Sequence, residues 1–375
     1  MACLAACSTA PNPNAQVVER LQGLVDSIAA EPDIPGVQLH VYSPSMALEW
    51  TGASGVGEVE TGVPLTPEHT VRNASNTKTY TAAAILRLWE MGRLDLDAPI
   101  RDFLTPEQSA MLSGDGYDLT AITVRSLLAH ASGLVDHGAA AEYFAAIQAA
   151  PDRRWTRDDQ ISGAVTWGDP LGPAGQAFSY SDTGYVLLGQ VIERVTGQDL
   201  GPAVRDLLDY DRLGLAATWW ELMEPVPDAA GPRAHQYVGG SDTFTWDPSI
   251  DSYGGGGLVT SSRDLAAFWY ALFDGRVFER EATLDALLTT PLPPDRTPYR
   301  LGVFVREFEG LTGYTHSGFW GTSAVYVPAL DLVVAGAVTE QTRARSAIEM
   351  TARAVRLIAE AQQGAAGLEI IGEGS

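Results

Sequence analysis

Hydrophobic residues near both ends of the chain follow the spacings of helices and strands. Apolar residues recur every three or four positions over 17–28, which predicts an amphipathic helix. Segments 36–42 and 48–51 are typical of two strands. From Tyr299 onward the apolar period is two, with a hairpin turn predicted at 328–331. A last amphipathic helix is predicted around Ile348, Val355 and Ile358.

The middle of the chain has a different pattern. Over 78–91 the spacing predicts a helix that Gly92 ends, and most periodic segments between 96 and 288 are helical. This order favours an α/β (α+β) fold in which both ends of the chain build one antiparallel sheet flanked by terminal helices. We expect 1–15 to be a leader or disordered, and 16–375 to form a single domain. Its sheet lobe would comprise about 16–70 and 295–362, and its mainly helical lobe about 71–294, with a cleft between them.

Charge and cysteine content exclude several classes of function. The net charge of −23 repels polyanions, so neither nucleic acid nor an anionic lipid surface is an expected partner. No apolar run is long enough to span a membrane. Both cysteines, Cys3 and Cys7, lie in the first seven residues, which excludes a disulfide, a thiolate metal site or a cysteine nucleophile in the rest of the chain. We expect no cofactor and no metal.

The N-terminal segment leaves two alternatives open. Leu4-Ala5-Ala6-Cys7 resembles a bacterial lipoprotein cleavage box, in which Cys7 would carry the lipid. Only three residues precede this segment, so either the true start lies upstream or this is an ordinary alanine-rich terminus. The first alternative implies a periplasmic or secreted protein with a lipid anchor.

A single lysine points to the candidate chemistry. Lysine and arginine together total 24, and Lys78 is the only lysine in the sequence. Lysine can lose its proton in a desolvated site, whereas arginine effectively cannot. Ser75 lies one helical turn before Lys78, at the start of the predicted helix, where the helix dipole favours alkoxide character and a nearby amine can accept the serine proton.

Two later segments complete a pattern. Tyr180 lies in Tyr180-Ser181-Asp182, ahead of a predicted helix, and His316 lies in the strand segment His316-Ser317-Gly318. Ser-x-x-Lys, Tyr-Ser-Asx and His-x-Gly in this order resemble the penicillin-recognising serine hydrolases: class C β-lactamases, DD-peptidases, D-aminopeptidases and related esterases. Two flanking segments, 127–134 and 255–265, match as well.

The resemblance assigns a role to each site residue. It implies a β-lactamase/DD-peptidase-like fold and an acyl-enzyme formed on Ser75, with Lys78 and Tyr180 as the proton-transfer pair and His316 as a further catalytic residue on the strand. The backbone N–H groups of Ser75 and Phe319 would form the oxyanion hole. Asp182, Ser317, Gly318 and Trp320 would bind a small-molecule or short-peptide substrate.

Two positions depart from the commoner pattern of that family. Asp182 occupies a position where asparagine is usual, and a carboxylate near Lys78 favours the ammonium form, so that Tyr180, with its pKa lowered by Lys78, becomes the expected base. Alternatively, Asp182 caps the following helix. His316 occupies a position where many relatives have a lysine that binds a substrate carboxylate.

These departures set the order of the functional hypotheses. An esterase or D-amino-acid amidase ranks above a β-lactamase or D-Ala-D-Ala carboxypeptidase. A non-catalytic acyl-binding or penicillin-binding sensor, and acyl transfer to an acceptor other than water, stay open. The sequence predicts no oligomeric state.

Overall fold

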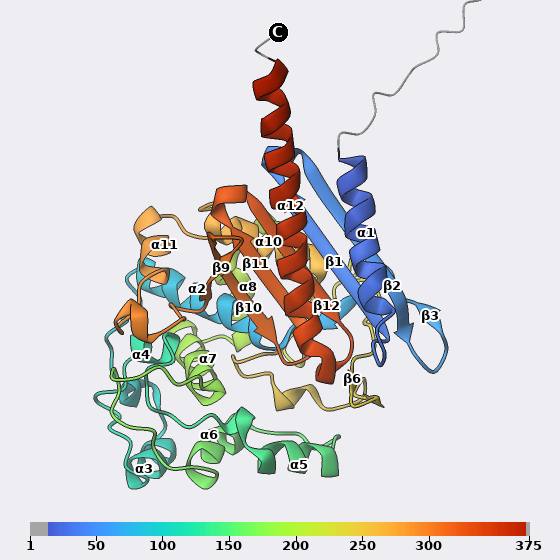
Figure 1. The fold of residues 1–375 in the computed structure, drawn as a ribbon. Coiled ribbons are helices and arrows are strands. Elements are labelled where there is room, and N and C mark those ends of the chain that lie inside the picture. Colours follow the sequence, from blue (N-terminus) through green and yellow to red (C-terminus); the bar gives the residue numbers. More distant parts are fainter. Residues whose placement is uncertain (1–13, 373–375) are drawn as a thin grey trace, which may run out of the picture.

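A seven-stranded antiparallel sheet organises the molecule (Figure 1). The computed structural model describes residues 14–372, so Cys3, Cys7 and the lipoprotein-like segment lie outside the described residues. Along the sheet the strands follow the order β3-β2-β1-β12-β11-β10-β9. Their bounds are β1 Gly36–Ser43, β2 Leu48–Glu58, β3 Val63–Pro64, β9 Phe304–Phe308, β10 Leu311–Gly318, β11 Thr322–Val327 and β12 Leu332–Val338.

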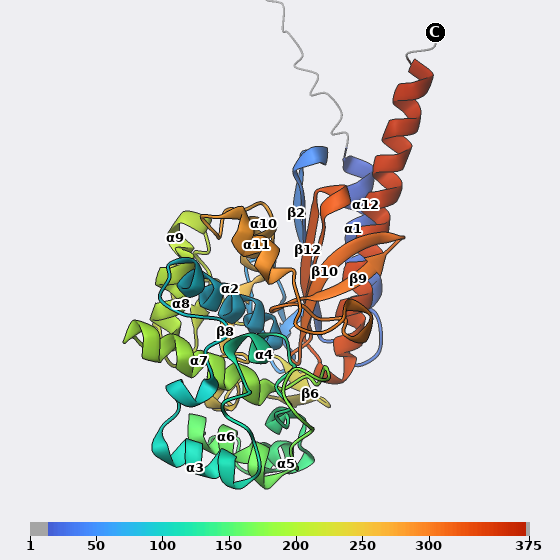
Figure 2. The same ribbon diagram turned by 90° about the vertical axis from the view of Figure 1, so that its left-hand side faces the viewer.

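The two ends of the chain meet at the centre of this sheet. Strand β1 pairs with β12, so an N-terminal and a C-terminal segment share one ladder, as the sequence predicts. The terminal helices α1 (Ala15–Ala29) and α12 (Ala344–Gly372) cover one face of the sheet (Figure 2). Helix α10 (Ser262–Phe273) packs on the other face. This architecture confirms the expected α+β fold.

Alternation along β12 explains how one strand contributes to two cores. Val334 packs with the terminal helices, whereas Val333 and Ala335 belong to the large core shared with the helical lobe. Successive strand side chains point to opposite faces. Both faces of β12 are therefore buried, which accounts for the continuous apolar run of its sequence.

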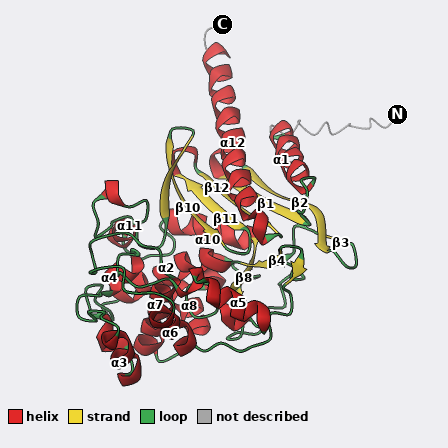
Figure 3. Cartoon of the chain, turned by 60° about the horizontal axis from the view of Figure 1, so that its bottom comes forward, coloured by secondary structure: helices red, strands yellow, loops and turns green. Residues whose placement is uncertain are grey.

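The helical lobe packs around α2 (Thr77–Glu90), whose side chains are almost all buried. Figure 3 shows the helices gathered on one side of the main sheet. Their bounds are α3 Pro106–Gly114, α4 Val124–Leu128, α5 Ala141–Ala149, α6 Arg157–Thr166, α7 Asp182–Thr196, α8 Leu200–Leu208, α9 Tyr210–Leu213 and α11 Glu281–Leu287. Within residues 14–372, no helix combines the length and apolar character that crossing a bilayer would require.

Short strands inside this lobe correct the sequence analysis. β4 (Thr70–Arg72), β8 (Leu258–Ser261) and β5 (Trp219–Trp220) form a second sheet, and β6 (Tyr237–Val238) pairs with β7 (Ser241–Asp242). These segments are too short to show a two-residue period in the sequence. Their pairing also depends on partners that lie far away along the chain. Strand β2 also runs well past Thr51, through a glycine-rich stretch that weakens the sequence signal.

His40 gives the sheet a pH-sensitive position. Its side chain is 2% exposed in β1, and its Nδ1 lies 2.7 Å from Thr51 Oγ1. Burial, partly opposed by Glu49, lowers the pKa of His40 to about 4. Between about pH 6.5 and pH 4, His40 therefore binds a proton in the unfolded chain but stays neutral in the folded protein.

We predict that His40→Gln makes the protein less sensitive to acid. In the wild type, His40 alone lowers the free energy of unfolding by about 2 kcal/mol between pH 7 and pH 5, because in this range only the unfolded chain binds a proton at this residue. Urea unfolding of both proteins at the two pH values measures this difference. Equal acid sensitivity of the two proteins would contradict the prediction.

Candidate active site

Ser75 lies in a short 3-10 turn, Ala74–Asn76, that continues directly into α2. Ala74 has a left-handed backbone with φ of 46°, which is uncommon for a residue other than glycine. Thr322 of β11 ties this turn to the sheet: its hydroxyl donates to Asn73 O at 2.8 Å and accepts from Asn76 Nδ2 at 2.8 Å. The nucleophile candidate is therefore fixed from both sides.

Lys78 lies fully buried one turn after Ser75, as the sequence spacing predicts. Its Nζ is 2.9 Å from Ser75 Oγ and donates to Gly255 O at 2.7 Å. It also forms an ion pair with the carboxylate of Asp182. Burial by itself would lower the pKa of Lys78, but Asp182, with Tyr180 and Asp251, outweighs burial and raises it. The resting side chain is an ammonium.

The ion pair decides between the two alternatives for Asp182. Ser181 is the N-cap of α7, since its hydroxyl accepts from Gly184 N at 3.3 Å. Asp182 is the next residue, and its side chain, about a quarter exposed, reaches Lys78. Burial acts to raise the pKa of Asp182, but the Lys78 ammonium outweighs it and holds that pKa below the ordinary value. The helix-cap alternative for Asp182 is wrong.

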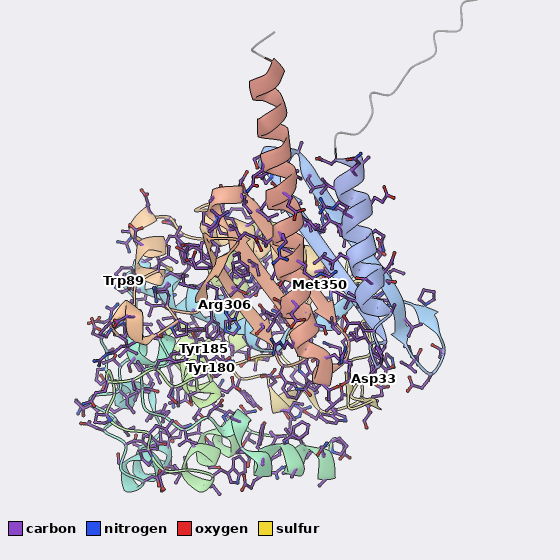
Figure 4. All side chains as sticks on the ribbon, in the orientation of Figure 1. Asp33, Trp89, Tyr180, Tyr185, Arg306 and Met350 are labelled. Carbon is purple, nitrogen blue, oxygen red and sulfur yellow. The ribbon has the colours of Figure 1, made fainter. Side chains whose placement is uncertain are left out.

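Tyr180 lies beside the same ammonium. Lys78 Nζ is 5.1 Å from the centroid of its ring. Figure 4 shows Tyr180 and Tyr185 near each other where the helical lobe meets the sheet. Burial raises the pKa of Tyr180, and the opposing effects of Lys78 and Ser75 are smaller. The expected lowering of this pKa is therefore wrong, because desolvation of the phenolate outweighs the nearby positive charge.

His316 lies near Tyr180, with ring centroids 6.3 Å apart, and is not among the residues that line the pocket of Ser75. Its Nδ1 lies 2.9 Å from the carbonyl oxygen of Ser317, which can only accept, so Nδ1 carries the proton. Its Nε2 then accepts from the Tyr299 hydroxyl at 3.2 Å. Burial and Lys78 lower the pKa of His316 to about 3. Both ring nitrogens are thus engaged within the protein, and the sequence analysis did not foresee the partner Tyr299.

The end of β10 approaches the nucleophile closely. A Cβ added to Gly318 would lie 2.4 Å from Asn73 O, so only glycine lets the strand pack against the turn that carries Ser75. Phe319 follows, 41% exposed, and its N–H donates to no backbone or side-chain acceptor among residues 14–372. Trp320 is buried and lines the pocket, whereas Ser317 does not line it.

A pocket with many aromatic side chains in its wall opens from Ser75. Its lining includes Asp182 and Phe319, together with residues that the sequence analysis did not single out for the site: His137, Tyr143, Phe144, Asp251 and Tyr253. Trp246 and Trp320 also lie in this wall. The pocket lining contains no arginine or lysine. Aromatic walls of this kind suit an apolar group next to a reacting carbonyl.

Two further carboxyl groups surround the Lys78–Asp182 pair. Burial and the charge of Asp182 raise the pKa of both Asp136 and Asp251 to about 7. Asp136 Oδ1 accepts from the backbone N–H of Asp182 at 3.0 Å. The Asp251 carboxyl forms no hydrogen bond or ion pair within the described part of the chain, and it faces the pocket. No sequence motif marks Asp251, because chain folding alone brings it here.

In the described chain, one group of three side chains has the spacing of metal ligands: Glu58, Glu60 and His235. None of them lines the pocket of Ser75. The chemistry that this pocket offers is therefore that of a serine hydroxyl between an ammonium and a phenol.

Comparison with known proteins agrees with this geometry. Penicillin-binding protein 4 of Amycolatopsis lactamdurans is 30% identical over 198 residues, which cover 51% of this chain and 46% of that protein. Esterase EstB of Burkholderia gladioli is 31% identical over 216 residues, covering 56% and 53% of the two chains. The chain thus spans about half the length of these curated relatives.

A solved structure matches over a longer range. The D-stereospecific amidohydrolase from Streptomyces sp. is 27% identical, has a TM-score of 0.75, and is matched over 89% of this chain and 98% of its own. The sequence profile of the family described as Beta-lactamase matches residues 21–359. The chain therefore belongs to the beta-lactamase family of penicillin-recognising serine hydrolases.

Proposed function

We propose that this protein hydrolyses an ester or small amide through an acyl-enzyme on Ser75, without a metal. One observation carries the proposal: the Ser75 hydroxyl lies 2.9 Å from the ammonium of Lys78 and lines an aromatic pocket. The similarity to an esterase and to a D-stereospecific amidohydrolase supports this class of reaction.

The proposed reaction has two halves. The reactive form is the one in which the Tyr180–Lys78 pair has lost one proton to solvent. In this form Ser75 Oγ adds to the substrate carbonyl while its proton passes to the pair, and the N–H groups of Ser75 and Phe319 stabilise the oxyanion. The same proton then goes to the departing alcohol or amine as the acyl bond breaks. In the second half, water adds to the acyl-enzyme, gives its proton to the same pair and releases the acid, which restores the Ser75 hydroxyl. His316, whose nitrogens are both engaged, supports Tyr299 rather than touching the substrate.

The charges in the pocket support a substrate without a free carboxylate. The pocket lining has two carboxyl groups and no arginine or lysine, so above about pH 7, where Asp251 is ionised, the pocket repels an anion and attracts an ammonium group. An esterase or D-amino-acid amidase therefore remains ahead of a β-lactamase or D-Ala-D-Ala carboxypeptidase. We further propose one domain over 16–375 in a periplasmic or secreted protein, with Cys7 as the site of a lipid anchor.

We predict that Ser75→Ala lowers hydrolysis of p-nitrophenyl esters below about 1% of the wild-type rate, because the nucleophile is lost. Mass spectrometry of rapidly quenched reactions should show the added acyl mass on the wild type and none on the variant. Far-UV circular dichroism checks that the fold is unchanged. An adduct on Ser75 that never turns over would instead indicate a non-catalytic sensor.

We predict that Asp182→Asn lowers the pKa of Lys78 and moves the alkaline rise of kcat/KM to lower pH. The variant removes the charge that holds the ammonium, while burial continues to favour the neutral amine. Because Lys78 is the only lysine in the sequence, lysine labelled with ¹⁵N at Nζ gives a single side-chain signal to titrate.

Lys78→Arg is the matched control for this measurement. It keeps a positive charge but should lose both the labelled signal and most of the activity, since arginine does not exchange its proton. The contradicting result is that neither the pKa of the Lys78 signal nor the pH profile of kcat/KM differs between the wild type and Asp182→Asn. In that case the Asp182 carboxylate does not set the pKa of Lys78.

We predict that Asp251→Asn weakens the preference for amine-bearing substrates. At pH 8 the wild type should favour the p-nitrophenyl ester of D-phenylalanine over that of 3-phenylpropanoic acid, and the variant should reduce this ratio of kcat/KM about 5-fold, as expected for about 1 kcal/mol of charge attraction. The exposed Asp274→Asn changes net charge equally and is the control. An unchanged ratio in Asp251→Asn would exclude a role in substrate selection.

A further inference from the structure

His130 is a buried histidine just beyond α4 with an unusual backbone. Its φ of 52° lies in the left-handed region, and its side chain is 1% exposed. Helix α4 ends at Leu128, and the left-handed turn directs both the carbonyl and the ring of His130 toward the segment that carries Tyr180. Such a backbone costs on the order of 1 kcal/mol or more in a residue other than glycine, so the surrounding contacts must hold it.

His130 binds the residues on both sides of Tyr180. Its carbonyl oxygen accepts from Ser179 N at 2.8 Å, and its Nδ1 accepts from Ser181 N at 3.1 Å. Its ring packs on the Tyr180 ring, with centroids 4.1 Å apart and planes inclined by 32°. Backbone and side chain of one residue therefore fix the tripeptide in three places.

The hydrogen bond to Ser181 also determines the protonation of the ring. A backbone N–H only donates, so Nδ1 has a free lone pair and Nε2 carries the single proton. Nε2 is buried and has no hydrogen-bond partner within the described residues. Burial and the charge of Lys78 lower the pKa of His130 well below its ordinary value. The ring thus remains neutral, and the acceptor for Ser181 persists over the working pH range.

Simple packing does not account for this arrangement. A phenyl ring would fill the space among Tyr180, Tyr185 and Tyr299 without burying an unpaired N–H, which costs about 1–3 kcal/mol. What a phenyl ring lacks is the Nδ1 acceptor next to Tyr180. The hydrogen bond to Ser181 is therefore the property that distinguishes histidine here.

We propose that His130 is a positioning residue that holds the Tyr180 phenol against Ser75 and Lys78 through its hydrogen bonds to Ser179 and Ser181. The proposal rests on the proposed function, in which Tyr180 and Lys78 transfer the Ser75 proton. A phenol displaced by even about 1 Å would slow that transfer strongly, while leaving the substrate pocket unchanged. His130 itself contacts neither substrate nor nucleophile.

Two variants separate the hydrogen bond from the ring packing. His130→Phe keeps an aromatic ring and loses the acceptor for Ser181 N. His130→Asn loses the ring but offers a side-chain carbonyl oxygen near the position of Nδ1, and asparagine tolerates the left-handed backbone. His40→Gln, which alters another buried histidine on the main sheet and outside the pocket of Ser75, is the control for replacing a buried histidine as such.

The readout is the rate constant of acylation of Ser75 by a p-nitrophenyl ester, with KM, burst amplitude and melting temperature measured in parallel. His130→Phe should acylate about 10-fold or more slowly, with an altered alkaline limb of the pH profile. The dissociation constant of the noncovalent substrate complex, taken from the substrate dependence of the acylation rate, should be unchanged. His130→Asn should acylate within about 3-fold of the wild type despite a lower melting temperature, and His40→Gln should acylate at the wild-type rate.

The results that would overturn the proposal differ from those that would overturn the function. If His130→Phe acylates within about 2-fold of the wild type, or if both His130 variants slow in proportion to their loss in melting temperature, His130 is structural only. A full burst amplitude in His130→Phe shows that Ser75 is still the nucleophile. Hydrolysis by the wild type that is unchanged in Ser75→Ala would instead overturn the proposed function.

Discussion

The ion pair between Lys78 and Asp182 is the interaction on which the site depends. A fully buried ammonium is expensive unless partners replace its water, and Lys78 has three: the Ser75 hydroxyl, the Gly255 carbonyl and the Asp182 carboxylate. These partners come from the turn before α2, the loop before β8 and the start of α7. The charge can be accommodated only when all three segments are in place. Formation of the site therefore depends on assembly of the helical lobe.

The sheet contributes to the same site through close backbone contact. Gly318 lets β10 pack against the segment before Ser75. The Thr322 hydroxyl of β11 forms hydrogen bonds with Asn73, which precedes Ser75, and with Asn76, which follows it. Because β11 and β12 are central strands whose two faces are buried, their positions are rigid. A nucleophile attached to them is held by the largest core in the molecule, which favours the fixed geometry that acyl transfer needs.

Local spacing explains which parts could be predicted from the sequence. Ser75 and Lys78 are one helical turn apart, so their contact follows from helix geometry, and the alternating apolar residues of β1 follow from strand side chains that point in turn to opposite faces. The orientation of His316, the approach of Asp251 and the pairing of β4 with β8 depend on residues far away in sequence. The prediction for the pKa of Tyr180 was wrong for a related reason. The direction of the shift depends on whether burial, which raises this pKa, outweighs the charge of Lys78, which lowers it.

The number of carboxyl groups around one ammonium also constrains the chemistry. Asp136, Asp182 and Asp251 surround Lys78. Because all three are largely buried away from water, three ionised carboxylates would repel one another strongly. Asp182 keeps its charge because it pairs directly with Lys78, which leaves Asp136 and Asp251 to take up protons near neutrality. The resting site thus stays close to electroneutral below pH 7 and becomes anionic above it. An acyl group that carries an ammonium would restore the balance in that pH range. The same ionised carboxylates raise the pKa of Lys78, so they favour a positively charged substrate without making the lysine a stronger acceptor at that pH.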